Sequence, residues 1–326
     1  MTYSPLDPVS RPTSANYISV VVLGLVWGGT FMVVAIALEA YGPATVAAAR
    51  TTLGAAALIA LALLLRRPPP SFSGRLASNV VALGIITVAA PFSLLAWGQT
   101  QVPSAFAGLS MAVLPLFVLP LAHWLVPGDR LTPRRAAGFG LGLLGVAILL
   151  GGGAMAGGSG DHAGWGRAAC LAATAFYAVG SIVTRRCPPI DPVWLSALTL
   201  VVGTTLLLPA MAVVEGWPAP AAPRQTVAIV VLGLVPTAFA ALLRVAVIRS
   251  AGPGFMTTVN YQVPVWAMVF GWAVLGEALP LRFFAALALI LAGLAVSQGL
   301  FRRRPAPPPP HPRSPRRAAT DPPPPP

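Results

Sequence analysis

Ten apolar segments, separated by short polar connections, constrain this chain more than any other feature of its sequence. A membrane-spanning helix needs about 20 apolar residues, and each segment is near that length. A helix satisfies its backbone hydrogen bonds internally, as a segment surrounded by lipid must. The sequence therefore predicts an all-α polytopic membrane protein with ten transmembrane helices, at residues 17–38, 43–65, 80–98, 104–125, 136–153, 166–183, 192–214, 227–248, 255–275 and 283–300.

The charged residues agree with a membrane location and exclude several functions. Only 9% of the residues are charged, against about a quarter in a soluble domain. All 21 basic residues are arginines, and the lack of lysine excludes a Walker A phosphate loop and a lysine Schiff base. The net charge of +13 could indicate nucleic acid. However, the arginines are scattered between apolar segments, so we predict no nucleic-acid partner.

The distribution of arginine among the connections predicts how the chain is inserted. With the N-terminus in the cytoplasm, thirteen arginines lie on the inner side and three on the outer side, leaving aside those of the distal tail. Cytoplasmic loops carry such an excess. Residues 1–14 are polar and lack the pattern of a cleaved signal peptide. We therefore expect a multi-pass protein of the bacterial inner (plasma) membrane with both termini in the cytoplasm.

An internal repeat appears when the chain is compared with itself at an offset of 149 positions. The matched residues are Gly54 with Gly203, Gly84 with Gly233, and Pro115 with Pro264. Each copy contains five helices, and because five is odd, the second copy must enter the membrane from the opposite side. The fold is therefore predicted to be two inverted five-helix repeats. Secondary transporters commonly have this architecture, with the substrate site near the midplane between the repeats.

The repeat divides the chain into five regions. They are predicted to be a cytoplasmic N-terminal segment (1–16), the first repeat (17–153), an outer or periplasmic loop (154–165), the second repeat (166–300) and an Arg/Pro-rich tail (301–326). The tail cannot bury a core, so we expect it to be disordered and cytoplasmic.

Several short motifs resemble EamA-type members of the drug/metabolite transporter superfamily. The first helix carries Trp27-Gly28-Gly29-Thr30-Phe31, and Arg50 follows in the second. The segment 114–116 and its repeat 263–265 share a central proline, and 275–277 completes a repeated "P…GE" pattern. Asp129 stands where such proteins often have glutamate. The resemblance implies a central cavity and the movement of metabolites or drugs, often outward.

Two arginines lie within predicted spans. Arg50 is only a few residues from the centre of the second helix, where insertion costs about 2.5 kcal/mol or more. No acidic residue occupies the centre of a span, so its expected partners are carbonyls, a polar neighbour or a substrate carboxylate. Arg244 is closer to the end of the eighth helix, where its side chain could reach water. Both are candidate substrate-binding residues; a purely structural role is the alternative for each.

Other polar and aromatic groups in the spans are further candidates for substrate binding. Asn260 and Tyr261 interrupt the ninth apolar segment just before Pro264, which frees a backbone carbonyl one turn earlier. Trp27 and Tyr177 could line the same cavity. Hydrogen bonds and packing between helices are the competing interpretations for these residues.

Two acidic residues are candidates for proton coupling. Glu277 and Asp129 both follow glycine at the ends of predicted helices. A carboxylate at such a position can instead cap a helix or pair with a nearby arginine. Because the span centres hold no carboxylate, proton coupling is expected to use these residues or the solute itself, with uniport or exchange as the alternative.

The sequence thus favours a secondary transporter, in the exporting direction, of small metabolites or drugs such as amino acids or organic acid derivatives. The alternatives are a passive facilitator or exchanger, and a membrane receptor or scaffold that does not transport. An enzyme is not expected, and neither a catalytic residue, a metal site nor a cofactor is predicted. A GxGxxG match at 140–145 lies inside an apolar helix, where glycines let helices pack closely. A homodimer through such glycine-rich faces is left open.

Overall fold

The computed structural model describes residues 12–125, 132–151, 162–219, 221–256 and 258–298, and within these ranges the chain is helical, without strands. The first repeat contains α1 (Ser14–Leu38), α2 (Pro43–Leu64), α3 (Gly74–Gly84), the π-helix η1 (Ile85–Ala89), α4 (Ala90–Gly98), α5 (Ser104–Ser110), the 3₁₀-helix η2 (Met111–Val113), α6 (Leu114–Leu125) and α7 (Pro133–Leu150). The second contains α8 (Ala163–Arg186), α9 (Pro192–Val214), α10 (Pro223–Leu232), the π-helix η3 (Gly233–Phe239), α11 (Ala240–Met256), α12 (Val259–Leu275) and α13 (Leu281–Gln298).

The described helices form ten spans. Nine segments of 18 to 26 residues are long and apolar enough to cross a membrane, and α12 is a shorter apolar helix. Three of the nine combine helices that join end to end through a π- or 3₁₀-helical turn: α3 with α4, α5 with α6, and α10 with the first half of α11. The prediction of an all-α membrane protein with ten transmembrane helices is confirmed.

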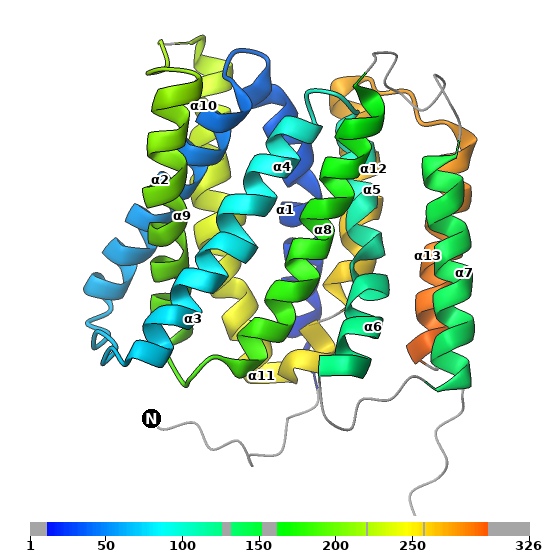
Figure 1. Ribbon diagram of the computed structural model, residues 1–326, viewed down its shortest axis with the longest axis horizontal. Coiled ribbons are helices and arrows are strands. Elements are labelled where there is room, and N and C mark those ends of the chain that lie inside the picture. The colour runs from blue at the N-terminus through cyan, green and yellow to red at the C-terminus, as the bar shows by residue number, and fades with distance from the viewer. Residues whose placement is uncertain (1–11, 126–131, 152–161, 220, 257, 299–326) are drawn as a thin grey trace, which may run out of the picture.

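The second repeat runs in the opposite direction to the first. Figure 1 shows α1 beginning at one face of the bundle, here called the lower face, and α8 beginning at the opposite, upper face. Both α1 and α8 open a repeat, so the two copies are related by inversion across the membrane. The sequence prediction of inverted repeats is therefore confirmed.

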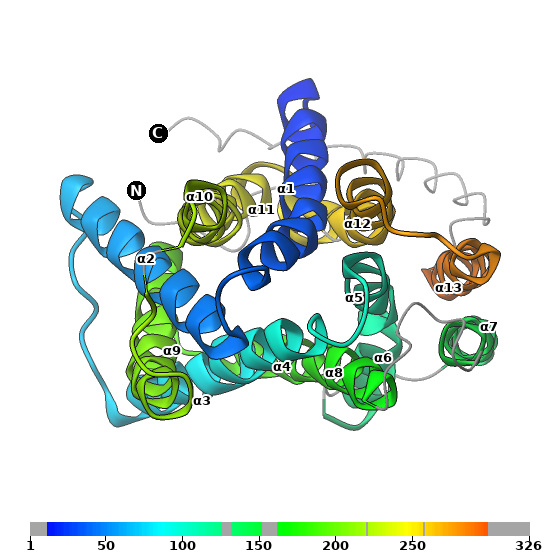
Figure 2. The same cartoon turned by 90° about the horizontal axis from the view of Figure 1, so that it is seen from above.

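The contacts between the repeats come in matched pairs. α1 packs against α12 and α10, and its counterpart α8 packs against α5, α6 and α4. α2 packs against its own counterpart α9, and α7 packs against its counterpart α13. Figure 2 shows the α7–α13 pair side by side at one end of the bundle. The two repeats thus enclose one shared interior.

Glycines lie where helices of the two repeats cross, and residues 149 positions apart in the sequence occupy equivalent places at these crossings. A β-carbon added to Gly54 would lie 2.6 Å from Cγ2 of Thr237, and one added to Gly203 would lie 2.5 Å from Cγ1 of Val88. Val88 stands 149 positions before Thr237, as Gly54 does before Gly203. The same relation joins Gly84, against Val202, to Gly233, against Leu53. Close helix approach at these crossings therefore requires a residue without a side chain.

Two of the three glycines of the GxGxxG match, Gly142 and Gly145, also pack helices together. A β-carbon added to Gly145 of α7 would lie 2.8 Å from Cγ1 of Ile290 in α13, and one added to Gly293 would lie 2.8 Å from the amide nitrogen of Gly142. These residues bring α7 and α13 into close contact, which is the role expected of glycine in a transmembrane helix.

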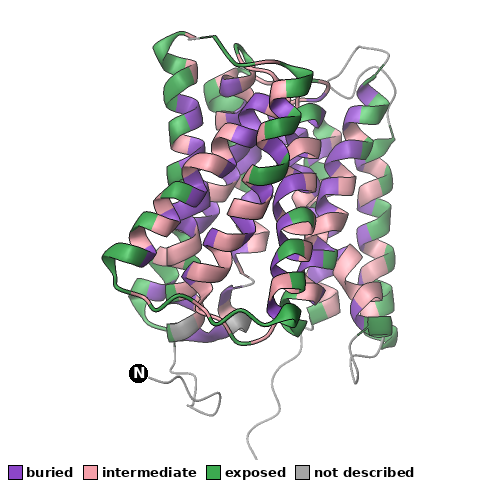
Figure 3. Cartoon of the chain, turned by 60° about the vertical axis from the view of Figure 1, so that its left-hand side comes forward, coloured by how far each residue is buried: buried purple, intermediate pink, exposed green. Residues whose placement is uncertain are grey.

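The outer surface of the bundle is apolar. Figure 3 shows exposed residues along the outward faces of the helices and buried residues within. Large apolar side chains such as Leu64 and Val213 are exposed by 80% and 86%, as a surface in contact with lipid requires. Exposed tryptophans stand near the ends of spans, at positions 124, 165 and 217, where aromatic side chains favour the membrane interface.

The eighth membrane span ends at Ile248, as predicted, but the helix continues beyond it. α11 continues past the predicted end at Ile248 to Met256, and it is kinked at Gly252, whose φ is 85°. α12 then begins at Val259 rather than at the predicted Phe255. A positive φ is readily adopted by glycine, and it turns the chain at the lower face. The sequence predicts a connection at residues 249–254, because Arg249 and the Gly-Pro-Gly run at 252–254 interrupt the apolar pattern.

Candidate functional site

A π-helical turn around Pro236 organises the interior of the bundle. Proline has no N–H, so the carbonyl of Leu232, four residues earlier, loses its usual partner in the helix. The hydroxyl of Thr237 donates a hydrogen bond to that carbonyl at 2.8 Å. η1 occupies the matching position in the first repeat, beside Pro91. Such π-helical segments often occur at functional sites.

Arg50 of α2 contacts this turn across the interface between the repeats. Its Nε donates to the Thr237 hydroxyl at 3.0 Å, so this hydroxyl both donates and accepts. The guanidinium carbon lies 3.9 Å from the centre of the Phe92 ring, in a cation–π contact. Within the described residues, no carboxylate forms an ion pair with Arg50 and no hydrogen bond reaches its two terminal nitrogens.

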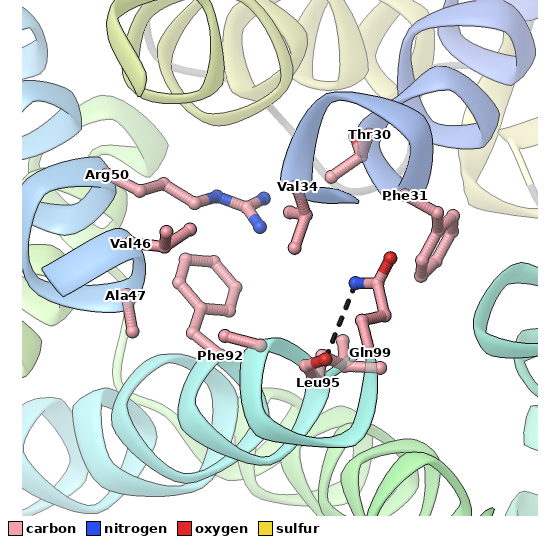
Figure 4. A pocket seen from close by; sticks show the side chains of 10 residues that line it. Thr30, Phe31, Val34, Val46, Ala47, Arg50, Phe92, Leu95 and Gln99 are labelled. Atoms are coloured by element: carbon pink, nitrogen blue, oxygen red, sulfur yellow. Dashed lines mark hydrogen bonds between the residues drawn. The ribbon is translucent and has the colours of Figure 1, made fainter. Parts of the chain in front are cut away.

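These terminal nitrogens face a narrow pocket between α1, α2 and α4 (Figure 4). The pocket has about 10 Å³ of free volume, which is close to the space of one water molecule. Its lining comprises Thr30, Phe31, Val34, Val46, Ala47, Arg50, Phe92, Leu95, Ala96 and Gln99. These residues belong to the upper parts of their helices, so the pocket lies between the centre of the bundle and the upper face.

Two of the predicted aromatic residues converge on the same region. The indole Nε1 of Trp27 donates to the carbonyl of Pro236 at 3.3 Å, next to the threonine that binds Arg50. Tyr177 of α8 interacts electrostatically with Arg50. The structure thus brings Trp27 and Arg50 together at η3, and it places Tyr177 of a third helix within range of Arg50.

Three other predicted residues lie elsewhere. Arg244 is exposed in α11, toward the lower face, and no hydrogen bond or ion pair to another described residue involves it. Asn260 and Tyr261 occupy the first turn of α12, at the lower face. The Tyr261 hydroxyl is buried without a hydrogen-bond partner among the described residues. None of the three lines the pocket around Arg50.

Glu277, one of the two candidates for proton coupling, caps a helix. Its carboxylate accepts backbone N–H groups of Ser104 at 2.7 Å and Ala105 at 2.8 Å, at the start of α5. A negative charge is favourable there because of the helix dipole. Glu215 does the same at the start of α2, where it accepts the N–H groups of Ala44 and Thr45. Asp129, the other candidate, lies outside the described residues.

The two remaining described carboxylates also stand at helix ends. Asp191 caps α9 and pairs with Arg67, and Glu39 pairs with Arg224. No described carboxylate lines the pocket. Within the described ranges, no group of three or more His, Cys, Asp or Glu side chains is placed to hold a metal ion.

Thr237, Phe92 and Gln99 were not singled out from the sequence, although all three contribute to the site. The signal for Thr237 is its place beside a proline in an apolar span, since a hydroxyl there can satisfy the freed carbonyl. Phe92 follows Pro91 in the matching span. Gln99 follows the last residue of α4, and in sequence it looks like a loop residue. Their approach to Arg50 depends on how the helices cross.

Comparisons with known proteins agree with this architecture. Residues 15–151 and 164–298 each match the model of the EamA-like transporter family. A solved structure with 25% sequence identity superposes with a TM-score of 0.62, covering 89% of this chain and 98% of the other. The two family matches correspond to the two halves whose contacts are paired in the structure.

Two relatives cover nearly the whole chain. A probable terminal-alkyne amino-acid exporter of Streptantibioticus cattleyicolor is 30% identical over 86% of this chain and 93% of its own length. An inner membrane transporter of Escherichia coli, of uncharacterised function, is 27% identical over 87% of this chain and 91% of its own length.

Proposed function

This chain belongs to the EamA-like transporter family, and from that premise we propose that it is a secondary transporter that exports small solutes carrying a carboxylate. The observation that carries the proposal is the guanidinium of Arg50, whose terminal nitrogens face the pocket between α1, α2 and α4. A guanidinium offers a planar pair of donors that matches a carboxylate. Arg50 is thus the proposed anchor for the solute.

The proposed solute class is amino acids and related organic acids. The supporting observations are a permanent cation without an ionised partner among the described residues, an aromatic ring beside it, and a relative named as an amino-acid exporter. A solute carboxylate would supply the negative charge that Arg50 lacks. Trp27, which donates to the carbonyl of Pro236, and Tyr177, which interacts with Arg50, are the proposed supporting groups.

The proposed mechanism is alternating access between the two repeats. A pocket with room for about one water molecule cannot hold an amino acid, so binding requires the surrounding helices to separate. The crossings at η1 and η3 suit such movement, because π-helical turns already depart from the regular helical hydrogen-bond pattern. In this proposal, the carboxylate binds when the pocket is open to one side and leaves when it opens to the other.

The proposed setting is the inner membrane, with both termini in the cytoplasm. The arginine distribution supports this orientation, and the Escherichia coli relative is named as an inner membrane protein. The upper face would then be the outer face. Export agrees with the name of the amino-acid exporter, while facilitated diffusion or exchange would use the same pocket.

Proton coupling is a separate part of the proposal. Because no described carboxylate lines the pocket, coupling would act through Glu277, Asp129 or the solute. Transport that depends on a pH gradient in the wild type, but not in Glu277→Gln or Asp129→Asn, would assign coupling to that residue. Transport without such dependence in the wild type would favour uniport or exchange.

The decisive experiment measures flux in proteoliposomes. Purified protein is reconstituted, and counterflow of labelled L-propargylglycine, a terminal-alkyne amino acid, is followed for the wild type and Arg50→Gln. We expect the variant to unfold at a similar temperature but to lose about a hundredfold in affinity, because removing one partner of a buried charge pair costs about 2–5 kcal/mol.

Arg244→Gln is the matched control, since it removes an arginine that lies outside the pocket. It should transport as the wild type does. If Arg244→Gln loses transport while Arg50→Gln keeps it, the site lies at the lower face instead. Binding of the solute without flux in the wild type would favour a receptor over a transporter.

A further inference from the structure

The side chain of Gln99 lies in the same pocket as Arg50 with one polar atom unused. Its Nε2 donates to the carbonyl of Leu95 at 3.4 Å. Its Oε1 is buried and has no hydrogen-bond partner among the described residues. A buried acceptor left without a donor is unfavourable, so this atom is available to a ligand.

The chemistry of the neighbouring carbonyl fixes which end of the amide is free. The Leu95 carbonyl can only accept a hydrogen bond, so the NH₂ end of the Gln99 amide must face it. The oxygen must then point away from α4. Figure 4 shows it directed toward Phe31 of α1, whereas the Arg50 guanidinium lies against Phe92 on the opposite side of the pocket.

The pocket therefore has hydrogen-bond donors on one side and a hydrogen-bond acceptor on the other. Arg50 offers N–H donors with a full positive charge, and Gln99 offers an acceptor with a partial negative charge. The cation–π contact with Phe92 occupies the face of the guanidinium, which leaves the edge with its N–H groups for a carboxylate. An amide at position 99 also leaves Arg50 unneutralised, whereas a carboxylate there could pair with it and compete with the solute.

We propose that Gln99 accepts a hydrogen bond from the ammonium group of a solute whose carboxylate is bound by Arg50, so that the site selects zwitterions over simple carboxylates. This inference rests on the proposed function, because it takes Arg50 as the carboxylate anchor. It narrows the substrate class to α-amino acids and compounds with a similarly placed amine. A solute without the amine leaves the Gln99 acceptor unpaired, and a site built around such a hydrogen bond discriminates against it.

The test uses three compounds that share one side chain. L-propargylglycine has both charged groups, pent-4-ynoate lacks the amine, and but-3-yn-1-amine lacks the carboxylate. Their affinities for the purified full-length protein are measured by calorimetry, and their flux is measured in proteoliposomes. In the wild type we expect the amino acid to bind at least about tenfold more tightly than pent-4-ynoate. A tenfold difference in affinity corresponds to the lower end of the free energy that a hydrogen bond to a charged group contributes.

Gln99→Met tests the residue, because methionine is also unbranched and of similar length. We expect this variant to bind L-propargylglycine about tenfold more weakly than the wild type while its affinity for pent-4-ynoate stays within about twofold. Gln101→Met is the matched control. The Gln101 amide donates to the hydroxyl of Thr100 and does not line the pocket, so this variant should keep the wild-type preference.

The outcomes separate this inference from the proposed function. If the wild type binds the amino acid and pent-4-ynoate equally, or if Gln99→Met keeps the preference, the role of Gln99 is wrong and the carboxylate anchor stands. If the wild type binds none of the three compounds, or if Arg50→Gln binds them as the wild type does, the proposed function itself fails. Thermal unfolding of each variant shows whether a lost affinity reflects a lost fold, and Gln99→Asn then provides a second variant that keeps the amide but shortens its reach.

Discussion

Helices of the two repeats cross at two equivalent places, but a polar side-chain contact joins the repeats at only one of the two. At one crossing, Arg50 of α2 donates to Thr237 of η3. At the equivalent crossing, Thr199 corresponds to Arg50 and Val88 corresponds to Thr237, each at the offset of 149 positions. Thr199 donates to the carbonyl of Ser196 in its own helix. The first crossing thus contains a cation, and the second contains none.

The same asymmetry extends to the rest of the pocket. Phe92 and Gln99 correspond by offset to Ala241 and Ile248. The symmetric parts of the molecule are the glycine crossings and the π-helical turns, and they determine how closely the repeats approach. In the proposed function, the asymmetric side chains determine where a polar solute binds. The side chains that make the pocket around Arg50 polar are therefore not repeated at the equivalent positions of the second copy.

The largest effect is expected from a test of the inversion itself. Ala40 and Pro189 are both exposed and are related by the offset of 149, yet they lie on opposite faces of the bundle. In a Cys187→Ser background, an impermeant thiol reagent added to intact cells should label Ala40→Cys and leave Pro189→Cys unlabelled until the membrane is permeabilised. Labelling of Pro189→Cys alone would reverse the orientation, and labelling of both from outside would contradict the inverted topology.

A smaller effect is expected where the two repeats are alike. Gly54→Ala and Gly203→Ala should lower the stability of the protein by similar amounts, about 1–3 kcal/mol each, because both added methyl groups overlap a side chain of the opposite repeat. Thermal unfolding in detergent provides the measurement. Gly140→Ala is the control, since a β-carbon there meets no atom within 4 Å. Loss of stability at one crossing without the other would show that the repeats do not pack equivalently.

The smallest effect is expected where the repeats differ by one hydroxyl. Thr237→Val removes the acceptor for Arg50 and the donor for the Leu232 carbonyl while keeping the shape of the side chain. We expect about a fivefold loss of solute affinity, since one hydrogen bond contributes roughly 1 kcal/mol. The equivalent change in the other repeat, Val88→Thr, should leave affinity unchanged. Equal effects of the two substitutions would argue that the hydroxyl acts on packing rather than on Arg50.

The sequence by itself determined the membrane location, the ten helices and the inverted repeats. These properties depend on the length, apolarity and order of segments, which are local and can be read along the chain. The depth of Arg50 in its span was equally readable. The helical course of the chain beyond Ile248 was not, because Arg249 and the Gly-Pro-Gly run at 252–254 are typical of a connection.

The tertiary structure decided which side chains surround Arg50. Thr237, Phe92 and Gln99 approach it from two other spans, while Arg244 and Asn260, which looked equally suitable in sequence, lie toward the lower face. Hydropathy places a residue at a depth in the membrane, but it does not specify which way a helix is rotated or what it crosses. Those are set by close packing between helices distant in the chain, at glycines such as Gly54 and Gly233.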